Sequence, residues 1–241
     1  MEEMLNQFII ALLKMFIHPI MLLLYLILLL YAGINFYINY KQYGKFFVSP
    51  WERFERKVGL TLKKHLCRYY GEKNIIVLSN ILLYNDKDIS SQTDHIFICP
   101  GGVFAVEDKN HKGWIFGDNH QKKWTNSYRQ KGYKNPVKSQ FLNPVRQNQG
   151  HILFLEGMFP ELKGKIQSIV VFPDEADFKK VEADNVYHLC GLKNCIKSLS
   201  KEKDIINVDQ YRGIILQMMT QDKSKDKQAV KRHIEYAKGK E

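Results

Sequence analysis

The fold of this chain is decided by residues 94–109, which read DHIFICPGGVFAVEDK. Two runs of β-branched and aromatic residues flank a Pro-Gly-Gly segment, which is typical of a β-hairpin. Charged residues stand at both bases of this hairpin: Asp94 precedes the first run, and Glu107, Asp108 and Lys109 follow the second. Charged side chains on a partly buried sheet are costly unless something uses them. The hairpin therefore marks a candidate functional site.

The register of the hairpin decides which charges meet. If the connection has two or four residues, Asp94 lies opposite Glu107. Side chains alternate along a strand, so Lys109 then shares the face of Glu107, while Asp108 points to the other face. A three-residue connection would shift the register by one.

Two facing carboxylates repel each other, and a cation beside them removes the repulsion. Asp94 and Glu107 are therefore candidate ligands for a divalent metal, Mg²⁺ or Mn²⁺, which takes carboxylate oxygens and waters. Such an ion polarises a phosphoryl group and acidifies a bound water, and Lys109 can orient that water or stabilise developing charge. The alternative is that Asp94 ends a turn while Glu107 and Lys109 decorate an exposed edge.

Further phrases surround the hairpin in a fixed order. They are Glu55-Arg56-Lys57-Val58 in a helix, Val77-Leu78-Ser79-Asn80-Ile81 in a strand, Gln92-Thr93-Asp94-His95-Ile96, residues 102–110, the Gly113-Trp114-Ile115-Phe116-Gly117 run with Trp124, and Asn143-Pro144-Val145-Arg146-Gln147. With these phrases, the stretch from about residue 51 to 172 resembles a nuclease-related domain of the NERD family, which is assigned to the PD-(D/E)xK nuclease superfamily.

The resemblance implies an α/β, restriction-endonuclease-like fold in which a mixed central sheet is flanked by helices. It also implies a metal-dependent phosphodiesterase site built from Asp94, Glu107 and Lys109, with Glu55 approaching from the first helix and Gln147 matching the helix glutamine of the family. The glycine that usually precedes the helix glutamate is a phenylalanine here. Members of the superfamily often lose activity, so the resemblance speaks more directly to fold than to chemistry.

Cations mixed with aromatic residues follow the hairpin, and this combination holds phosphates and stacks exposed bases. The candidate nucleic-acid-binding residues are Lys112, Lys122, Lys123, Trp124, Arg129 and Lys131. Plain packing is the alternative for the tryptophans, and ordinary surface exposure is the alternative for the lysines. The expected partner is nucleic acid, DNA rather than RNA.

An apolar segment precedes the domain. Lys14 and Lys41 bracket 26 residues without Asp, Glu, Lys or Arg, more than the roughly 20 needed to cross a bilayer. We expect an anchor over residues 1–47 with one transmembrane helix at about 20–40; a buried helix of a soluble core is the alternative. Lysines and arginines after the span favour a single-pass protein of the cell membrane with its C-terminal domain in the cytoplasm. Residues 5–17 either lie at the interface or lengthen the span.

Composition agrees with this division. Of the net charge of +11, residues 1–50 contribute +1, from three lysines and two glutamates, which leaves +10 on the rest. A basic cytoplasmic domain suits a polyanion, either nucleic acid or the anionic leaflet. The four cysteines lack CxxC spacing and are expected to be free and partly buried, with a metal site at His188, Cys190 and Cys195 a minor alternative.

The remaining chain is read as a nuclease-related domain with its C-terminal extension over residues 48–220, and a basic tail over 221–241 that is frayed helix or disordered. Expected helices are 52–70, 144–158 and 208–219; expected strands beside the hairpin are 75–84, 113–117, 123–125, 166–172 and 185–189. The sequence thus predicts a membrane-anchored, metal-dependent nuclease. The rival predictions are a catalytically silent nucleic-acid-binding or scaffold protein, and a peripheral signalling adaptor whose charge serves the lipid.

Overall fold

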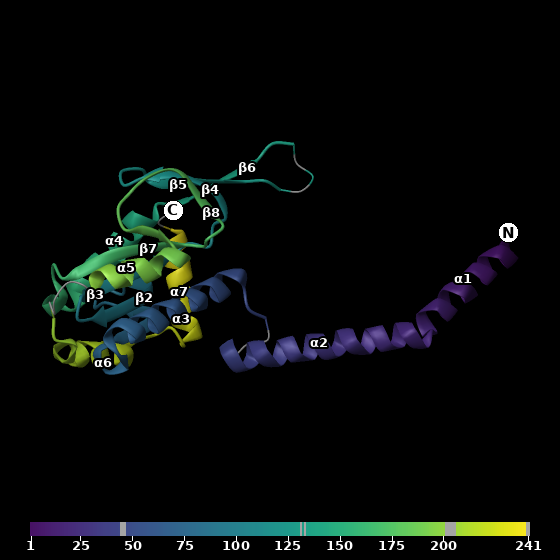
Figure 1. Cartoon of the computed structure of the whole chain (residues 1–241), viewed down its shortest axis with the longest axis horizontal. Coiled ribbons are helices and arrows are strands. Elements are labelled where there is room, and N and C mark those ends of the chain that lie inside the picture. The colour runs from purple at the N-terminus through teal and green to yellow at the C-terminus, as the bar shows by residue number, and fades with distance from the viewer. Residues whose placement is uncertain (44–46, 131, 133, 201–205, 240–241) are drawn as a thin grey trace. The chain divides into compact units, whose positions relative to one another are not determined.

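The computed structural model describes residues 1–43, 47–130, 132, 134–200 and 206–239, and it divides into two compact units, 1–50 and 51–241 (Figure 1). The first unit holds helices α1 (Glu2–Ile17) and α2 (Pro19–Tyr43). Within α2, the segment Pro19–Lys41 is long and apolar enough to cross a membrane, and none of it is buried by other parts of the protein. The predicted span falls inside this segment.

A five-stranded sheet forms the centre of the second unit. Its order is β1-β2-β3-β7-β9, with β1 (Ile76–Tyr84), β2 (Ser90–Cys99), β3 (Gly102–Asp108), β7 (Ile166–Phe172) and β9 (Val186–His188). The first three strands are antiparallel, whereas β3, β7 and β9 run parallel. The predicted mixed α/β fold is confirmed.

The register of the β2–β3 hairpin follows the sequence prediction. Cys99 pairs with Gly102 and His95 pairs with Val106, across the two-residue connection Pro100-Gly101. Gly102 has φ +138°, a backbone conformation that side chains with a Cβ rarely adopt. This glycine therefore lets the second strand begin immediately after the turn.

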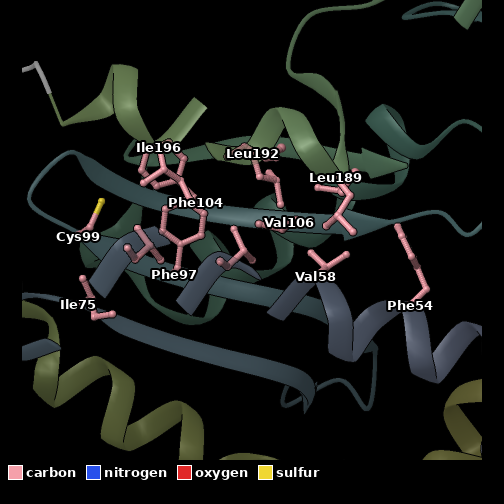
Figure 2. Packing of buried hydrophobic residues seen from close by; sticks show 14 residues of the cluster. Phe54, Val58, Ile75, Phe97, Cys99, Phe104, Val106, Leu189, Leu192 and Ile196 are labelled. Atoms are coloured by element: carbon pink, nitrogen blue, oxygen red, sulfur yellow. The ribbon is translucent and has the colours of Figure 1, made fainter. Parts of the chain in front are cut away.

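Helices cover both faces of the sheet (Figure 1). On one face lie α3 (Pro50–Tyr70) and α5 (Leu192–Leu199); on the other lie α4 (Pro144–Met158) and α6 (Arg212–Gln221). Apolar residues of α3 recur every fourth position, which puts them on one side of the helix. Figure 2 shows two of them, Phe54 and Val58, beside Phe97, Phe104 and Val106 of the sheet, with Leu192 and Ile196 packing from the α5 side.

The strand β1 changes its side-chain alternation at Asn80, which has φ +54°. Leu78 before it and Ile81 and Leu83 after it pack into the same cluster, on the α4 and α6 face. A strictly alternating strand would send these residues to opposite faces. The left-handed conformation of Asn80 thus lets apolar side chains from both halves of β1 pack into the same core.

A second sheet extends from the central one in the order β6-β5-β4-β8, built from β4 (Gly113–Asp118), β5 (Lys123–Tyr128), β6 (Val137–Leu142) and β8 (Ala176–Glu182). Trp124 of β5 stacks on Phe172 of β7, with ring centroids 6.2 Å apart, and this contact joins the sheets. A Cβ on Gly117 would lie 2.3 Å from the Trp124 ring, so only glycine fits there.

Short 3₁₀ helices complete the chain at Glu72–Asn74, Pro160–Leu162, Leu189–Gly191 and Val208–Tyr211. Within the tail that was expected to be frayed helix or disordered, residues Lys227–Lys238 form helix α7. Asp226 caps the first turn by accepting the backbone N–H groups of Gln228 and Ala229, and the Ala229 side chain is fully buried. All four cysteines are free, as predicted.

Candidate active site

The charged ends of β2 and β3 open into a pocket of about 530 Å³. Its floor includes Asp94, Glu107 and Lys109, and its walls come from α3, α4 and α7. The hairpin therefore brings together the three residues at the centre of the predicted site, and it does so through the expected register.

Lys109 lies between a carboxylate and an amide. Its Nζ donates to Glu107 Oε1 at 2.5 Å and to Gln147 Oε1 at 2.9 Å. Glu107 is 2% exposed and Lys109 is 14% exposed, so this ion pair is largely removed from water. The structure thus brings Gln147 to the site, on the α4 face of the sheet.

The position of Gln147 depends on the start of α4. Asn143 caps the helix by accepting the N–H groups of Val145 and Arg146, and its Nδ2 donates to backbone carbonyls of Asp118 and Gln121. This side chain fixes the first turn of α4 against the turn between β4 and β5. Because side chains four residues apart share a helix face, a residue at position 151 joins Gln147 above the site.

That residue is His151, which was not among the residues predicted from the sequence. Its Nδ1 lies 2.7 Å from Ser91 Oγ, and its Nε2 lies 3.4 Å from Glu107 Oε2. If the serine hydroxyl donates to Nδ1, the ring carries its proton on Nε2 and directs it toward Glu107. The i to i+4 spacing from Gln147 is the signal that could have identified this residue.

The pKa values of the two floor carboxylates are shifted in opposite directions. Burial alone raises the pKa of Glu107, but Lys109 and His151 outweigh burial and hold it below its usual value. Burial, with the negative charges of Glu107 and Asp108, raises the pKa of Asp94 well above its usual value, although Asp94 Oδ2 accepts the Asp108 N–H at 2.7 Å. A cation beside this pair would favour the ionised form of both acids.

The donor set fits a hard divalent cation. Among the described residues, buried Glu107 Oε2 has no hydrogen-bond partner, and Asp94 lies next to it on the floor. Within the same part of the chain, no three His, Cys, Asp or Glu side chains form a metal-binding group. Two carboxylates therefore have to suffice, as they do for Mg²⁺ sites in which waters and a substrate phosphate complete the shell.

A second polar cluster occupies the opposite face of the hairpin, against α3. His95 Nε2 lies 2.9 Å from Asp108 Oδ2 and 3.1 Å from the backbone oxygen of Glu55, and its Nδ1 lies 2.8 Å from Ser79 Oγ. A carbonyl oxygen only accepts, so Nε2 carries the proton and Ser79 donates to Nδ1. A Cβ on Gly59 would lie 2.9 Å from this imidazole, so glycine allows α3 to approach closely.

Glu55 belongs to this α3 side of the site. It lines the pocket, and its negative charge is one cause of the raised pKa of Asp108, after burial and Glu107. The prediction that Glu55 approaches from the first helix agrees with this position.

None of the predicted nucleic-acid-binding residues that the structure describes lines the pocket. Lys112, Lys122, Lys123 and Arg129 are exposed, and Lys112 pairs with Glu175 at 2.8 Å. Lys131 lies outside the described residues.

The prediction that Trp124 binds nucleic acid is wrong. Its side chain is completely buried, and its Nε1 donates to the backbone oxygen of Asp118. This tryptophan packs the two sheets together and has no face left for a base.

The chain matches the model of a protein family described as NERD, nuclease-related domain, over residues 50–173. It is also 29% identical over 188 residues to an uncharacterised protein of Bacillus anthracis, an alignment that covers 76% of this chain and 84% of that protein. No solved structure matches the chain significantly.

Proposed function

Because the chain belongs to the nuclease-related domain family, we propose that it is a membrane-anchored, Mg²⁺- or Mn²⁺-dependent nuclease that hydrolyses phosphodiester bonds, with DNA as the expected substrate. The observation that carries this proposal is the floor of the pocket. There, a buried and ionised Glu107 lies beside Asp94, and Lys109 bridges Glu107 to Gln147. A purely structural ion pair would have no need of a second acid facing an open pocket.

Asp94 and Glu107 would hold the divalent ion, which when bound polarises the scissile phosphate and lowers the pKa of a coordinated water. Burial alone lowers the pKa of Lys109, but the nearby acids, Glu107 first among them, together outweigh burial and raise it, so the ammonium stays charged. A fixed, desolvated cation at this position stabilises the negative charge that develops on the phosphate. Gln147 Oε1 accepts a hydrogen bond from the Lys109 ammonium group and so fixes its direction.

His151 acts on the carboxylate rather than on the phosphate. Its Nε2 lies 3.4 Å from Glu107 Oε2, while Ser91 Oγ contacts the other ring nitrogen. At this distance the imidazole is one of the groups that lower the pKa of Glu107, and Oε2 still has no hydrogen-bond partner among the described residues.

The direct test is cleavage by the full chain purified in detergent. Labelled single-stranded DNA, duplex DNA and RNA are incubated with Mg²⁺, Mn²⁺ or a chelator, using wild type, Glu107→Gln and the matched control Glu161→Gln, an exposed glutamate far along the chain. Wild type and Glu161→Gln should cleave with metal alone, and Glu107→Gln should lose about a hundredfold or more. Cleavage by Glu107→Gln at the wild-type rate would contradict the assignment.

Metal binding is tested separately by calorimetry. Wild type should bind Mg²⁺ or Mn²⁺, and Asp94→Asn should lose that binding because one of the two carboxylates is gone. Equal binding by both proteins would remove the metal from this hairpin. If wild type binds nucleic acid but never cleaves with any divalent ion, the non-catalytic nucleic-acid-binding function becomes the better proposal.

Membrane anchoring rests on the apolar segment Pro19–Lys41. We propose that it spans the cell membrane once and leaves the C-terminal domain in the cytoplasm, because basic residues follow the span. Carbonate washing should not release the protein, and a tag placed after Glu241 should be accessible from the cytoplasmic side alone. Release by carbonate would show that the segment does not span.

A further inference from the structure

Helix α7 lies beyond the region that matches the family, yet it forms part of the candidate site. His233, Tyr236 and Ala237 line the same pocket as Asp94, Glu107 and Lys109. The family match ends at residue 173, whereas α7 covers Lys227–Lys238. The wall that α7 supplies therefore lies outside the matched region.

Several interactions hold α7 against the sheet. The Tyr84 hydroxyl donates to the backbone oxygen of Ala229 at 2.6 Å, and Ser90 Oγ lies 2.9 Å from His233 Nδ1. The Arg232 guanidinium stacks over the Tyr84 ring at 5.1 Å and approaches Asp88 at 3.5 Å. These interactions come from both ends of the β1–β2 connection, so α7 has a defined position.

Two consecutive serines of β2 connect helix α7 to the candidate active site. Ser90 contacts His233 of α7, and Ser91 contacts His151 of α4, whose other ring nitrogen faces Glu107. One short segment of β2 thus fixes a helix on each side of the pocket. The position of α7 is set by the same strand that carries Asp94.

The rim of the pocket is aromatic, while its floor is acidic. Trp51 is 48% exposed and lines one side of the pocket. Tyr236 of α7 is partly exposed and also lines the pocket. Helix α7 also carries four Lys or Arg residues against one glutamate. Solvent-accessible aromatic rings with cationic side chains nearby are the combination that binds single strands, because each base offers a face for stacking.

The shape of the pocket limits what reaches its floor. Its volume of about 530 Å³ is that of a small-molecule site, and Glu107 at the floor is 2% exposed. Walls from α3, α4 and α7 surround the floor. The bases of a duplex are stacked and paired in the duplex interior. A strand can therefore enter a pocket of this size only after its nucleotides have left the stack.

We propose that α7 completes the pocket as a substrate-binding wall and selects single-stranded nucleic acid, whose bases stack on Tyr236 and Trp51. The inference rests on the proposed nuclease function for what happens to the strand, but the selection itself concerns binding and needs no metal.

The experiment measures binding in the presence of a chelator, where no metal-dependent cleavage occurs. One labelled DNA sequence is titrated as a single strand and as a duplex with the full chain in detergent, and binding is followed by fluorescence anisotropy. Wild type should bind the single strand at least about tenfold more tightly. Tyr236→Ala should weaken single-strand binding about tenfold, on the scale of stacking one base on an aromatic ring, and should leave duplex binding unchanged.

Three variants make this result specific. Tyr236→Phe keeps the ring and should bind as wild type does. Ile234→Ala shortens an exposed side chain of the same helix that does not line the pocket, and it should also bind normally. Trp51→Ala tests the other side of the rim and should weaken single-strand binding; it decides the matter if thermal unfolding shows that Tyr236→Ala is misfolded.

Equal affinity of wild type for single strand and duplex would overturn the inference. So would normal single-strand binding by folded Tyr236→Ala, or by Trp51→Ala where the first variant does not fold. These outcomes are distinct from failure of the nuclease proposal, since selective binding through Tyr236 without metal-dependent cleavage would support the inference and refute the enzyme.

Discussion

The two faces of the β2–β3 hairpin carry polar clusters of similar size but opposite character. On the α4 face, Glu107 and Lys109 form a charged pair above the pocket floor. On the α3 face, burial lowers the pKa of His95 and raises that of Asp108 well above its usual value, so both groups are driven toward their neutral forms. The pair Glu107–Lys109 is thus held in its charged form, whereas Asp94 on the same face has a raised pKa, as Asp108 has on the other.

Unpaired atoms alone do not distinguish these faces. Among the described residues, each face has one buried carboxylate oxygen without a hydrogen-bond partner, Glu107 Oε2 on one side and Asp108 Oδ1 on the other. The difference is that Glu107 keeps its negative charge beside a fixed cation. Charge retained at the floor of a pocket is a better indication of chemistry than an unsatisfied atom.

The largest effect that tests this comparison is on catalysis. Lys109→Ala should reduce metal-dependent cleavage by about a hundredfold or more while altering nucleic-acid affinity little, because the ammonium acts on charge that develops during the reaction. Cleavage rates, and binding in the presence of a chelator, are measured for Lys109→Ala and for Lys163→Ala, an exposed lysine near the opposite end of the sheet. If Lys109→Ala cleaves as well as wild type, the charged face has no catalytic role.

The opposite face should respond in stability. His95→Ala leaves Asp108 and the Glu55 carbonyl without their shared donor and opens a space in the core, so the free energy of unfolding should fall by about 2 kcal/mol or more. Gln147→Ala on the charged face should change it by less than about 1 kcal/mol and should reduce cleavage instead. Denaturant titration of both variants gives the comparison, and similar losses of stability would remove the distinction between the faces.

Much of this architecture could be predicted from the sequence. The Pro-Gly-Gly segment and the alternation of β2 and β3 predicted the hairpin, and the two-residue connection gives the one of the two registers that puts Glu107 and Lys109 on a shared face. The α4 helix was predicted with its observed bounds, because proline is common at the first position of a helix and Pro144 stands there. Local sequence patterns were sufficient to predict an element wherever the pattern lay entirely within one strand, hairpin or helix.

Sequence reasoning failed where the signal depends on partners distant in the chain. Strand β8 has the sequence ADFKKVE, and its many charges are not typical of a strand. It forms a strand because it pairs in parallel with β4. Helix α7 looked like a solvated tail because its burial rests on small Ala229 and on hydrogen bonds from β1 and β2. Trp124 was predicted to stack on bases because the residue type alone does not show whether a tryptophan is buried or exposed.

Acidic pH offers a test at His111, a residue that belongs to neither polar cluster of the hairpin. Burial, and then the charge of Lys109, lower the pKa of His111 from 6.5 to about 4, and its ring stacks on Phe141 at 4.0 Å. Between those pH values the unfolded chain binds the proton and the folded chain does not, so this residue favours folding above pH 6.5 and loses that contribution as the pH falls. The slope from this residue is up to about 1.4 kcal/mol per pH unit.

His111→Phe keeps an aromatic ring against Phe141 and removes the titration. Its free energy of unfolding should therefore fall less than that of wild type between pH 6.5 and about 4. Denaturant titration at several pH values measures the difference, with the exposed His120→Gln as the comparison variant. Parallel pH profiles of wild type and His111→Phe would show that His111 is protonated as easily in the folded protein as in the unfolded one.

The smallest expected effect concerns the exposed cations outside the pocket. Lys122 and Lys123 are fully on the surface at the start of β5, and they can reach backbone phosphates without reaching the reacting group. Neutralising both should weaken nucleic-acid binding and reduce the log–log salt slope by up to roughly one unit for each phosphate that the protein no longer neutralises. Binding is measured over a range of salt concentrations beside Lys163→Gln/Lys165→Gln, which removes the same charge from the other end of the sheet. Equal slopes in the two double variants would mean that binding follows the net charge of the domain, and that the surface of β5 has no particular role in it.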